Sequence, residues 1–360
     1  MGDERDINFQ STERQKRILP EDSFGDWKWR EALAELMVPL IGSLYRDGVN
    51  LMIYGKSLVN ESPVAIMKAH RFARQSDNNE LSEFETYPMI EYISTLNLHD
   101  CEIDIGEIAV KCPFFDEIKE DQSKIKDYLN KELESVIDVE TVRPDEPKSI
   151  VLYGFGRIGR LLARMMTQTT GPGNYFRIKA IVIRKASDDD IFKRASLLSR
   201  DSVHGPFDGT VRVDEENTSL VVNGNAIKVI YASSPDEVKY ADHNIIDPIV
   251  IDNTGVWRDE DSLSKHLKSG ASKVILTAPA KGDIKNIVFG INDDILNDND
   301  AIISAASCTT NAIVPVLNAI NDEYSIEGGH IETVHAYTND QNLIDNFHKG
   351  DRRGRGAPLN

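Results

Sequence analysis

The feature that most constrains this chain is a glycine-rich turn that directly follows a short apolar segment. A GxGxxG pattern, Gly154-Phe155-Gly156-Arg157-Ile158-Gly159, comes after Ser149-Ile150-Val151-Leu152-Tyr153 and opens a segment with helical apolar spacing. Alone this pattern is weak, and a purely structural glycine turn is the alternative. Between a strand and a helix, however, the glycines permit a tight turn, close approach to a pyrophosphate and close helix packing. We therefore predict a dinucleotide-binding site.

The residues that follow alternate between β-branched segments and helical stretches, which is typical of parallel α/β construction. A turn at Asn223-Gly224-Asn225 between apolar segments predicts a hairpin insertion. We expect a Rossmann domain over residues 149–308. Its further strands are predicted at residues 178–183, 248–252, 273–277 and 301–306.

The first 140 residues have a different character. Apolar side chains recur at three- and four-residue steps near Leu33, after Ser62-Pro63 and from Ile125, which predicts amphipathic helices. Ser62-Pro63 is a good N-cap and first-turn pair. We expect a mainly helical N-terminal domain over residues 1–140, joined by a proline-containing linker over residues 138–149. We find no catalytic constellation in it.

Composition excludes several classes of partner. The 41 basic and 59 acidic side chains give a formal net charge of -18, which disfavours nucleic acid and anionic membranes as partners. The three cysteines show no CxxC spacing, so we expect neither a disulfide framework nor a metal site, and a reducing cytosol fits. No signal-peptide pattern or membrane-length apolar segment is present. We expect a cytoplasmic protein.

A thiol and an imidazole are candidates for covalent catalysis. Cys308 lies between the predicted strand 301–306 and a helix that we expect to begin at Asn311, with residues 309–311 available to cap it. A helix start and a nearby imidazole such as His335 both favour the nucleophilic thiolate. The pair alone leaves open a second interpretation, an ordinary buried cysteine and a core histidine.

The end of the second Rossmann strand bears on the choice of cofactor. An acid that grips the ribose 2'-hydroxyl of NAD is expected there, but the sequence is Arg184-Lys185-Ala186-Ser187. Two cations and a hydroxyl suit a 2'-phosphate, so the sequence favours NADP over NAD. The alternatives are that Arg184 and Lys185 are solvated, or that Asp188 reaches back to the ribose.

Taken together, these motifs resemble phosphorylating glyceraldehyde-3-phosphate dehydrogenase. The resemblance covers residues 149 to the end, and the Ser-Cys-Thr-Thr-Asn block is its most specific part. The first 140 residues have no counterpart in the ordinary enzyme, so the layout is similar to a longer bacterial form. The motifs, in order, are Gly154 to Arg160, Asp201-Ser202-Val203-His204-Gly205, Asn253-Thr254-Gly255-Val256, Ala306 to Asn311 and His335-Ala336-Tyr337-Thr338-Asn339-Asp340-Gln341.

The resemblance implies a role for each matching residue. Cys308 is the nucleophile and His335 its base. Ser307, Thr309 and Arg353 line the site for inorganic phosphate, although helix capping is an alternative for the two hydroxyls. Thr338 and Asp340 belong to the pocket for the substrate's own phosphate. The cofactor-binding residues are Gly154, Phe155, Gly156, Arg157, Ile158, Gly159, Arg184, Lys185, Thr254, Gly255 and Thr277.

The resemblance also implies an activity. The protein would oxidise glyceraldehyde 3-phosphate to 1,3-bisphosphoglycerate, and run the reverse, through a cysteine thioester with hydride transfer to NAD(P). It would be a homotetramer of glycolysis or gluconeogenesis. Two alternatives stay open: a dehydrogenase of a related phosphosugar aldehyde such as erythrose 4-phosphate, and a non-catalytic nucleotide-binding regulatory or scaffold protein.

Two departures from the family pattern stand out. Asn346-Phe347 replaces the Leu-Pro that NAD-using relatives commonly have. The sequence stops at Asn360, where the family continues through further strands of the α+β catalytic domain. We therefore expect residues 309–360 to be the beginning of that domain, within a longer polypeptide. The sequence assigns no role to residues 1–140.

Overall fold

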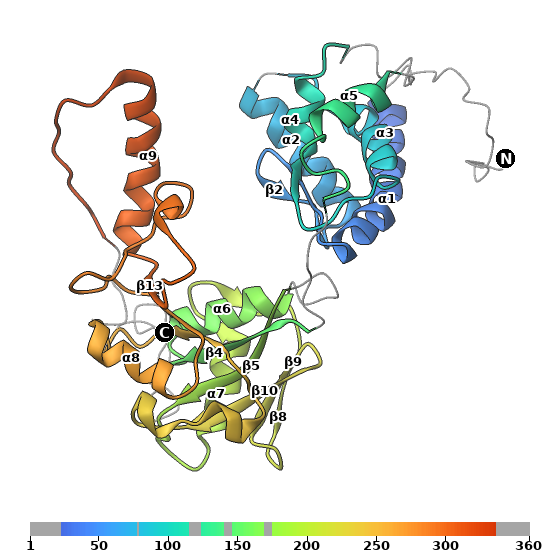
Figure 1. Ribbon diagram of the computed structural model, residues 1–360. Helices are drawn as coiled ribbons and strands as arrows, with labels where there is room; N and C mark the ends of the chain where they lie inside the picture. Colours follow the sequence, from blue (N-terminus) through green and yellow to red (C-terminus); the bar gives the residue numbers. More distant parts are fainter. Residues whose placement is uncertain (1–22, 78, 115–123, 140–145, 169–174, 336–360) are drawn as a thin grey trace. The chain divides into compact units, whose positions relative to one another are not determined.

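The structure is a computed structural model that describes residues 23–77, 79–114, 124–139, 146–168 and 175–335 (Figure 1). The chain forms two compact units. The first contains residues 1–143 with 171–173, and the second contains residues 144–170 with 174–360. The boundary between Arg143 and Pro144 lies inside the segment that the sequence predicts as a linker.

The N-terminal unit is built mainly of helices around an apolar core. Ser62 accepts a hydrogen bond from the Ala65 amide, and Pro63 opens the second helix, as predicted. Buried Met37, Ile66 and Leu129 belong to the core. The helices are α1 (Ser23–Arg46), α2 (Pro63–Asp77), α3 (Glu83–Ile93), α4 (Ile105–Val110) and α5 (Ile125–Glu132).

A small sheet in this unit was not predicted from the sequence. Strand β1 (Asn50–Ile53) pairs antiparallel with β2 (Lys56–Ser57) and parallel with β3 (Glu102–Asp104). Asp104 fixes the β1–β2 turn, because its carboxylate accepts hydrogen bonds from the amides of Tyr54 and Gly55 at 3.0 and 2.7 Å. Strands this short leave no two-residue periodicity to detect.

The second unit contains an eight-stranded sheet with the strand order β13-β12-β11-β4-β5-β10-β9-β8. Strands β13 to β10 in that order run parallel, and β9 and β8 add antiparallel strands at one edge. Asn223 and Gly224 turn between β9 and β10 with positive φ, which confirms the predicted hairpin. The strands are β4 (Lys148–Tyr153), β5 (Phe176–Ile183), β8 (Val211–Asp214), β9 (Ser219–Val222), β10 (Asn225–Tyr231), β11 (Ile249–Asp252), β12 (Lys273–Leu276) and β13 (Ile302–Ser304).

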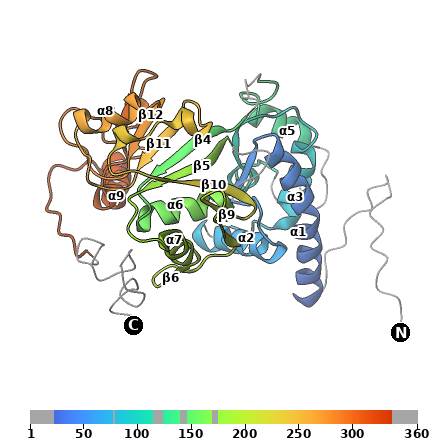
Figure 2. The same cartoon turned by 90° about the horizontal axis from the view of Figure 1, so that it is seen from below.

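Helices cover both faces of this sheet (Figure 2). Along β4, Ile150 and Leu152 pack in one cluster with side chains of α6 (Arg157–Gln168) and α7 (Asp190–Ser199). Val151 and Tyr153 pack in a second cluster with a side chain of α8 (Glu260–Lys268). Alternate residues of a strand point to opposite faces, so the sheet is doubly wound. The predicted α/β fold class is confirmed.

Shorter elements complete the second unit. A two-stranded ribbon joins β6 (Arg200–Asp201) to β7 (Gly205–Pro206), and α9 (Cys308–Tyr324) follows β13. The 3-10 turns are η2 (Pro235–Glu237), η3 (Tyr240–His243) and η4 (Asp293–Ile295). Among the described helices, none has both the length and the apolar character needed to cross a bilayer.

Candidate active site and cofactor site

The glycine turn between β4 and α6 cannot accommodate side chains. Gly154 has φ +92°, and a Cβ built on it would lie 2.9 Å from Cγ2 of Thr254. A Cβ on Gly159 would lie 2.5 Å from the carbonyl oxygen of Gly154. The backbone at Gly154 and Gly159 is therefore packed too closely to leave room for a side chain. A bare backbone at the start of a helix such as α6 is what a pyrophosphate needs to bind there.

The arginines after the turn are anchored by a second motif. Nη2 atoms of Arg157 and Arg160 lie 3.6 and 3.8 Å from Oδ2 of Asp201. The other oxygen, Oδ1, accepts from the amides of Val203 and His204, both at 2.9 Å. Burial alone would raise the pKa of Asp201, but the hydrogen bonds from His204 and Val203, with the Arg157 charge, lower it to about 2. Asp201 thus links the glycine motif to the Asp-Ser-Val-His-Gly motif.

A cavity of about 230 Å³ opens at the carboxyl ends of the parallel strands. Gly154 follows β4, Arg184 follows β5, and Thr254 follows β11. In doubly wound sheets this edge is where ligands bind. With Phe155, the structure therefore brings four of the predicted cofactor residues to one cavity, whose other lining residues include Tyr153, Val256 and Trp257.

Around the predicted 2'-end of the cofactor, the exposed Arg184 lines the cavity. Lys185 Nζ lies 3.5 Å from Oδ1 of the fully exposed Asp188. Sequence reasoning missed Arg194, which lines the same cavity and whose Nε lies 3.5 Å from Oδ1 of the buried Asp190. The only signal for it was the four-residue spacing of an acid and a base at the start of a helix.

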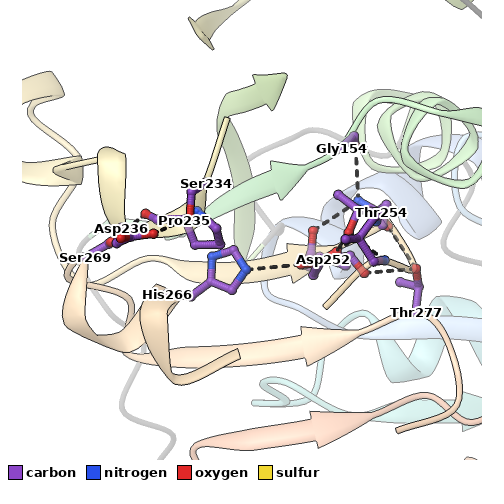
Figure 3. Close-up of polar contacts among 12 residues, drawn as sticks. Gly154, Ser234, Pro235, Asp236, Asp252, Thr254, His266, Ser269 and Thr277 are labelled. Atoms are coloured by element: carbon purple, nitrogen blue, oxygen red, sulfur yellow. Dashed lines mark hydrogen bonds and ion pairs between the residues drawn. The ribbon is translucent and has the colours of Figure 1, made fainter. Parts of the chain in front are cut away.

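Figure 3 shows how the loop after β11 is held. The buried Asp252 accepts hydrogen bonds on Oδ1 from the amide and the hydroxyl of Thr254, at 2.8 and 2.7 Å. The hydroxyl of Thr277 donates to the Asp252 carbonyl at 3.1 Å. Gly255 continues the turn with φ +66°. Of the three predicted cofactor residues, Thr254 is therefore held by the carboxylate of Asp252 and Thr277 by its backbone carbonyl, and sequence reasoning did not single out this acid.

Cys308 is the first residue of α9, so the expected helix start at Asn311 is wrong. Ser307 is the N-cap, because its Oγ accepts from the Thr310 amide at 3.0 Å. The strand is also shorter than predicted: β13 ends at Ser304, and Ala306 turns the chain with φ +56°. Asn311 closes this turn, since its Nδ2 donates to the carbonyls of Ala305 and Ser307 at 2.8 and 2.9 Å.

The predicted thiol and imidazole lie together. Sγ of Cys308 is 3.2 Å from Nε2 of His335, and both residues are exposed. The hydrogen bond to His335 lowers the pKa of Cys308, and contacts with Thr309 act in the same direction. Burial raises the pKa of the other thiols, Cys101 and Cys112. Cys308 is thus exposed next to an imidazole and differs from the other two thiols in the direction of its pKa shift.

The predicted phosphate-binding residues fall around the start of α9. Thr309 lines a cavity of about 450 Å³ together with Cys308 and His335. Ser307 lines a neighbouring cavity of about 370 Å³, together with Asn286 and Asn292. Thr338, Asp340, Arg353 and the Asn346-Phe347 pair lie outside the described residues. Within the part of the chain that the structure describes, no group of three or more His, Cys, Asp or Glu side chains is arranged to hold a metal ion.

Comparison with known proteins adds a second line of evidence. Residues 148–260 match the family described as "Glyceraldehyde 3-phosphate dehydrogenase, NAD binding domain", and residues 307–360 match "Glyceraldehyde 3-phosphate dehydrogenase, C-terminal domain". A glyceraldehyde-3-phosphate dehydrogenase-like protein of Pseudomonas aeruginosa (strain UCBPP-PA14) is 53% identical over 328 residues, which are 90% of this chain and 70% of the relative. The chain belongs to the glyceraldehyde-3-phosphate dehydrogenase family.

The resemblance seen in the sequence is thus confirmed, and the NAD-binding domain supports a nicotinamide dinucleotide as cofactor. The glyceraldehyde-3-phosphate dehydrogenase of Thermotoga maritima is 41% identical over 211 residues, which are 59% of this chain and 60% of that protein. That of Clostridium acetobutylicum is 38% identical over 212 residues, which are 58% of this chain and 60% of that protein. An alignment of 328 residues must include much of the N-terminal unit, so this unit is shared with the Pseudomonas relative.

Proposed function

We propose that this protein is a phosphorylating glyceraldehyde-3-phosphate dehydrogenase that interconverts glyceraldehyde 3-phosphate and 1,3-bisphosphoglycerate. The observation that carries this proposal is the 3.2 Å contact between Sγ of Cys308 and Nε2 of His335, at the start of α9. A lowered pKa increases the share of the nucleophilic thiolate, and an exposed imidazole beside it can exchange protons with a substrate.

Each of these side chains has a defined part in the proposed reaction. His335 takes the proton of Cys308, the thiolate adds to the aldehyde carbon, and His335 returns the proton to the carbonyl oxygen to give a hemithioacetal. The nicotinamide cofactor, when bound, accepts the hydride that leaves this carbon. His335 accepts the hydroxyl proton, which leaves a thioester on Cys308. An oxygen of inorganic phosphate then attacks the thioester carbon, and the thiolate leaves as the acyl phosphate forms.

The polar residues around α9 suit the binding of phosphate. Thr309 lies in the same cavity as Cys308, and the first turn of a helix attracts anions. As the N-cap, the Ser307 hydroxyl oxygen accepts a hydrogen bond through a lone pair. When the Thr310 hydroxyl donates in its 2.8 Å contact with Ser307, the Ser307 hydroxyl proton remains free to bind a phosphate oxygen. By resemblance, Arg353 would join them, and Thr338 and Asp340 would bind the substrate's own phosphate.

We propose NADP as the favoured cofactor, with NAD as the alternative. Arg184 lines the cavity, and the buried Arg194 adds a second cation to its wall. Asp188 is poorly placed to accept from a ribose hydroxyl, because it is fully exposed and pairs with Lys185. The glycine cradle and the loop from Thr254 to Gly255, with Thr277, would hold the rest of the dinucleotide.

A spectrophotometric assay of the full-length protein tests the proposal. Glyceraldehyde 3-phosphate, phosphate and either NADP or NAD should give reduced cofactor, and omission of phosphate should abolish steady-state turnover. A higher kcat/KM with erythrose 4-phosphate would favour the related phosphosugar dehydrogenase. Cofactor binding without turnover of either aldehyde would overturn the enzymatic proposal and favour a regulatory or scaffold protein.

We further propose that the protein is cytoplasmic and acts in glycolysis or gluconeogenesis as a homotetramer. Membership of the family and the sparse, unpaired cysteines support this proposal. Light scattering of the purified full-length protein should give four times the mass of the chain. A monomer or dimer would contradict the tetramer.

A further inference from the structure

Helix α8 carries a buried histidine that reaches the loop of the cofactor cavity. His266 is 0% exposed, and its Nε2 lies 3.1 Å from Oδ2 of Asp252 (Figure 3). Asp252 is also 0% exposed, and its other oxygen holds the amide and the hydroxyl of Thr254. An imidazole Nε2–H can donate to this carboxylate oxygen. The three residues form a chain of contacts from α8 to the cavity wall.

The rest of the His266 side chain is committed to this position. Tyr153 meets the imidazole edge to face, with ring centroids 4.7 Å apart. Among the described residues, Nδ1 of His266 is buried without a hydrogen-bond partner. Burial of a polar ring with one unsatisfied nitrogen is costly. Packing alone would be served better by an apolar side chain, so the contact with Asp252 is the property that requires a histidine here.

The same helix end also holds the opposite loop of the cavity. The Ser269 hydroxyl, just after α8, donates to the Pro235 carbonyl at 2.6 Å, and Lys265 Nζ lies 3.8 Å from Oδ1 of Asp236. Lys265 also lies over the Trp257 ring, 5.4 Å from its centroid. Ala232, shortly before this loop, lines the cavity, as do Thr254 and Trp257. The end of α8 therefore contacts both loops that border the cavity.

We propose that His266 is a positioning residue for cofactor binding: through Asp252 it fixes Thr254 against the glycine cradle. The inference rests on the proposed function only in taking the cavity of β4, β5 and β11 as the dinucleotide site. Without His266, one oxygen of the buried Asp252 loses its donor, and the loop must shift to solvate it. Thr254 then moves away from Gly154, to which it is so close that no Cβ would fit.

The test measures binding of NAD and NADP to the full-length protein by calorimetry. His266→Ala should raise the Kd of both cofactors by about tenfold or more, the scale of leaving a buried acceptor unpaired. His266→Gln can place an amide N–H near the position of Nε2, so its Kd should stay within about threefold of wild type. Lys268→Ala, an exposed change on the same helix, is the matched control and should change neither Kd.

Two further measurements separate positioning from loss of structure. Alkylation of Cys308 without cofactor should proceed at the wild-type rate in His266→Ala, because the thiol has its own partner in His335. Thr254→Val should add little to the Kd of His266→Ala, although it weakens binding on its own, because both changes remove one contact chain. An unchanged Kd in His266→Ala, or equal weakening by Ala and Gln, would overturn the proposal.

Should His266→Ala fail to fold, His266→Gln and Ser269→Ala decide the matter. Ser269→Ala removes only the hydrogen bond to Pro235 on the other loop, and a rise of about threefold or more in both Kd values is expected. Wild-type Kd in Ser269→Ala together with a wild-type melting temperature would refute the role of α8. If glyceraldehyde 3-phosphate is not turned over while His266→Ala, unlike His266→Gln, still weakens cofactor binding, the proposed reaction fails and this inference stands.

Discussion

The two units of this protein use the same kinds of side chain in opposite ways. In the second unit, the imidazole of His335 meets a thiol on an exposed surface, 3.2 Å from Cys308. In the N-terminal unit, His70 is 0% exposed and its Nε2 lies 2.7 Å from the Thr86 hydroxyl. Glu83, 1% exposed, lies 3.3 Å from the other ring nitrogen. Residue type alone therefore does not identify a reactive site.

The difference lies in what controls ionisation. Burial lowers the pKa of His70 to about 4 and raises the pKa of Glu83 to about 7, so the interior of the N-terminal unit favours uncharged forms. The hydrogen bond from His335 lowers the pKa of Cys308 and so favours its charged form. His70 and Glu83 are buried groups whose shifts come chiefly from burial, whereas the shift of the exposed Cys308 comes chiefly from a specific partner, His335.

The largest effect is expected at the thiol. Cys308→Ser should reduce turnover by about 1,000-fold or more, because a serine hydroxyl stays protonated beside His335. The initial rate of cofactor reduction by the full-length protein measures it. Cys101→Ser, which changes a thiol of the N-terminal unit, is the matched control and should keep wild-type activity. Near-normal turnover of Cys308→Ser, or inactivation that tracks alkylation of Cys101 or Cys112, would sink the mechanism.

The second effect concerns the base. His335→Asn should slow turnover by about 100-fold while leaving cofactor affinity intact, which is the usual scale for loss of a general base. The pH midpoint for alkylation of Cys308 by iodoacetamide should rise, because the main cause of the lowered pKa is removed. In the wild-type protein this midpoint should lie below those of Cys101 and Cys112. A variant that loses only cofactor affinity would assign His335 a structural role.

The third effect sharpens the cofactor assignment. Arg184→Glu with Lys185→Glu should lower the affinity for NADP relative to NAD by tenfold or more, because only NADP presents a 2'-phosphate to be repelled. Titration of both cofactors against wild type and the double variant measures the ratio. Arg212→Glu, on the edge strand β8, changes charge away from the cavity and should leave the ratio unaltered. An unchanged ratio of NADP to NAD affinity in the double variant would mean that a residue other than Arg184 and Lys185 contacts the ribose 2'-position.

Much of the second unit could be predicted because its pattern repeats over whole elements. The strand before Gly154, the glycine turn and the hairpin at Asn223-Gly224 each have a local sequence pattern, and the structure forms the element that each pattern predicts. The start of α9 was misplaced because Cys308, Thr309 and Thr310 are weak helix formers, and the deciding contact is a single Ser307 cap.

The contacts missed from the sequence share a physical cause. Asp252 with His266, and Asp190 with Arg194, are buried polar pairs. No motif marks the first pair, and the four-residue spacing of the second is equally common among exposed pairs on helices. Cys308 and His335, 27 residues apart, were a candidate pair from their residue types and the expected helix start, and the family resemblance then assigned their roles. The small sheet of the N-terminal unit was not predicted, because its strands are too short to show a two-residue alternation of apolar and polar side chains.

The smallest effect on the reaction, and the sharpest test of the comparison, is expected at Glu83. Glu83→Gln should leave turnover at wild-type values, because the residue belongs to the N-terminal unit. It should instead change how stability depends on pH. The folded-state pKa of Glu83 is raised from 4.5 to about 7, chiefly by burial. Below about pH 4.5 Glu83 is protonated in both the folded and the unfolded state, so it does not change the free energy of unfolding. As the pH rises towards 7, the N-terminal unit loses stability.

At pH 8 the free energy of unfolding of the wild-type protein is lower by about 3 kcal/mol for this reason, since each pKa unit corresponds to about 1.4 kcal/mol. Glu83→Gln should therefore unfold at higher urea than wild type at pH 8, and at nearly equal urea at pH 5. The lowered pKa of His70 acts in the opposite sense, with stability lost as the pH falls from 6.5 towards 4, but it does so in both proteins. In the 360-residue chain, whose third tryptophan is Trp257, fluorescence of Trp27 and Trp29 in a Trp257→Phe background reports this unit. An equal stability difference at both pH values would show that Glu83 does not titrate in this range, and the contrast between a neutral interior and a charged site would fail.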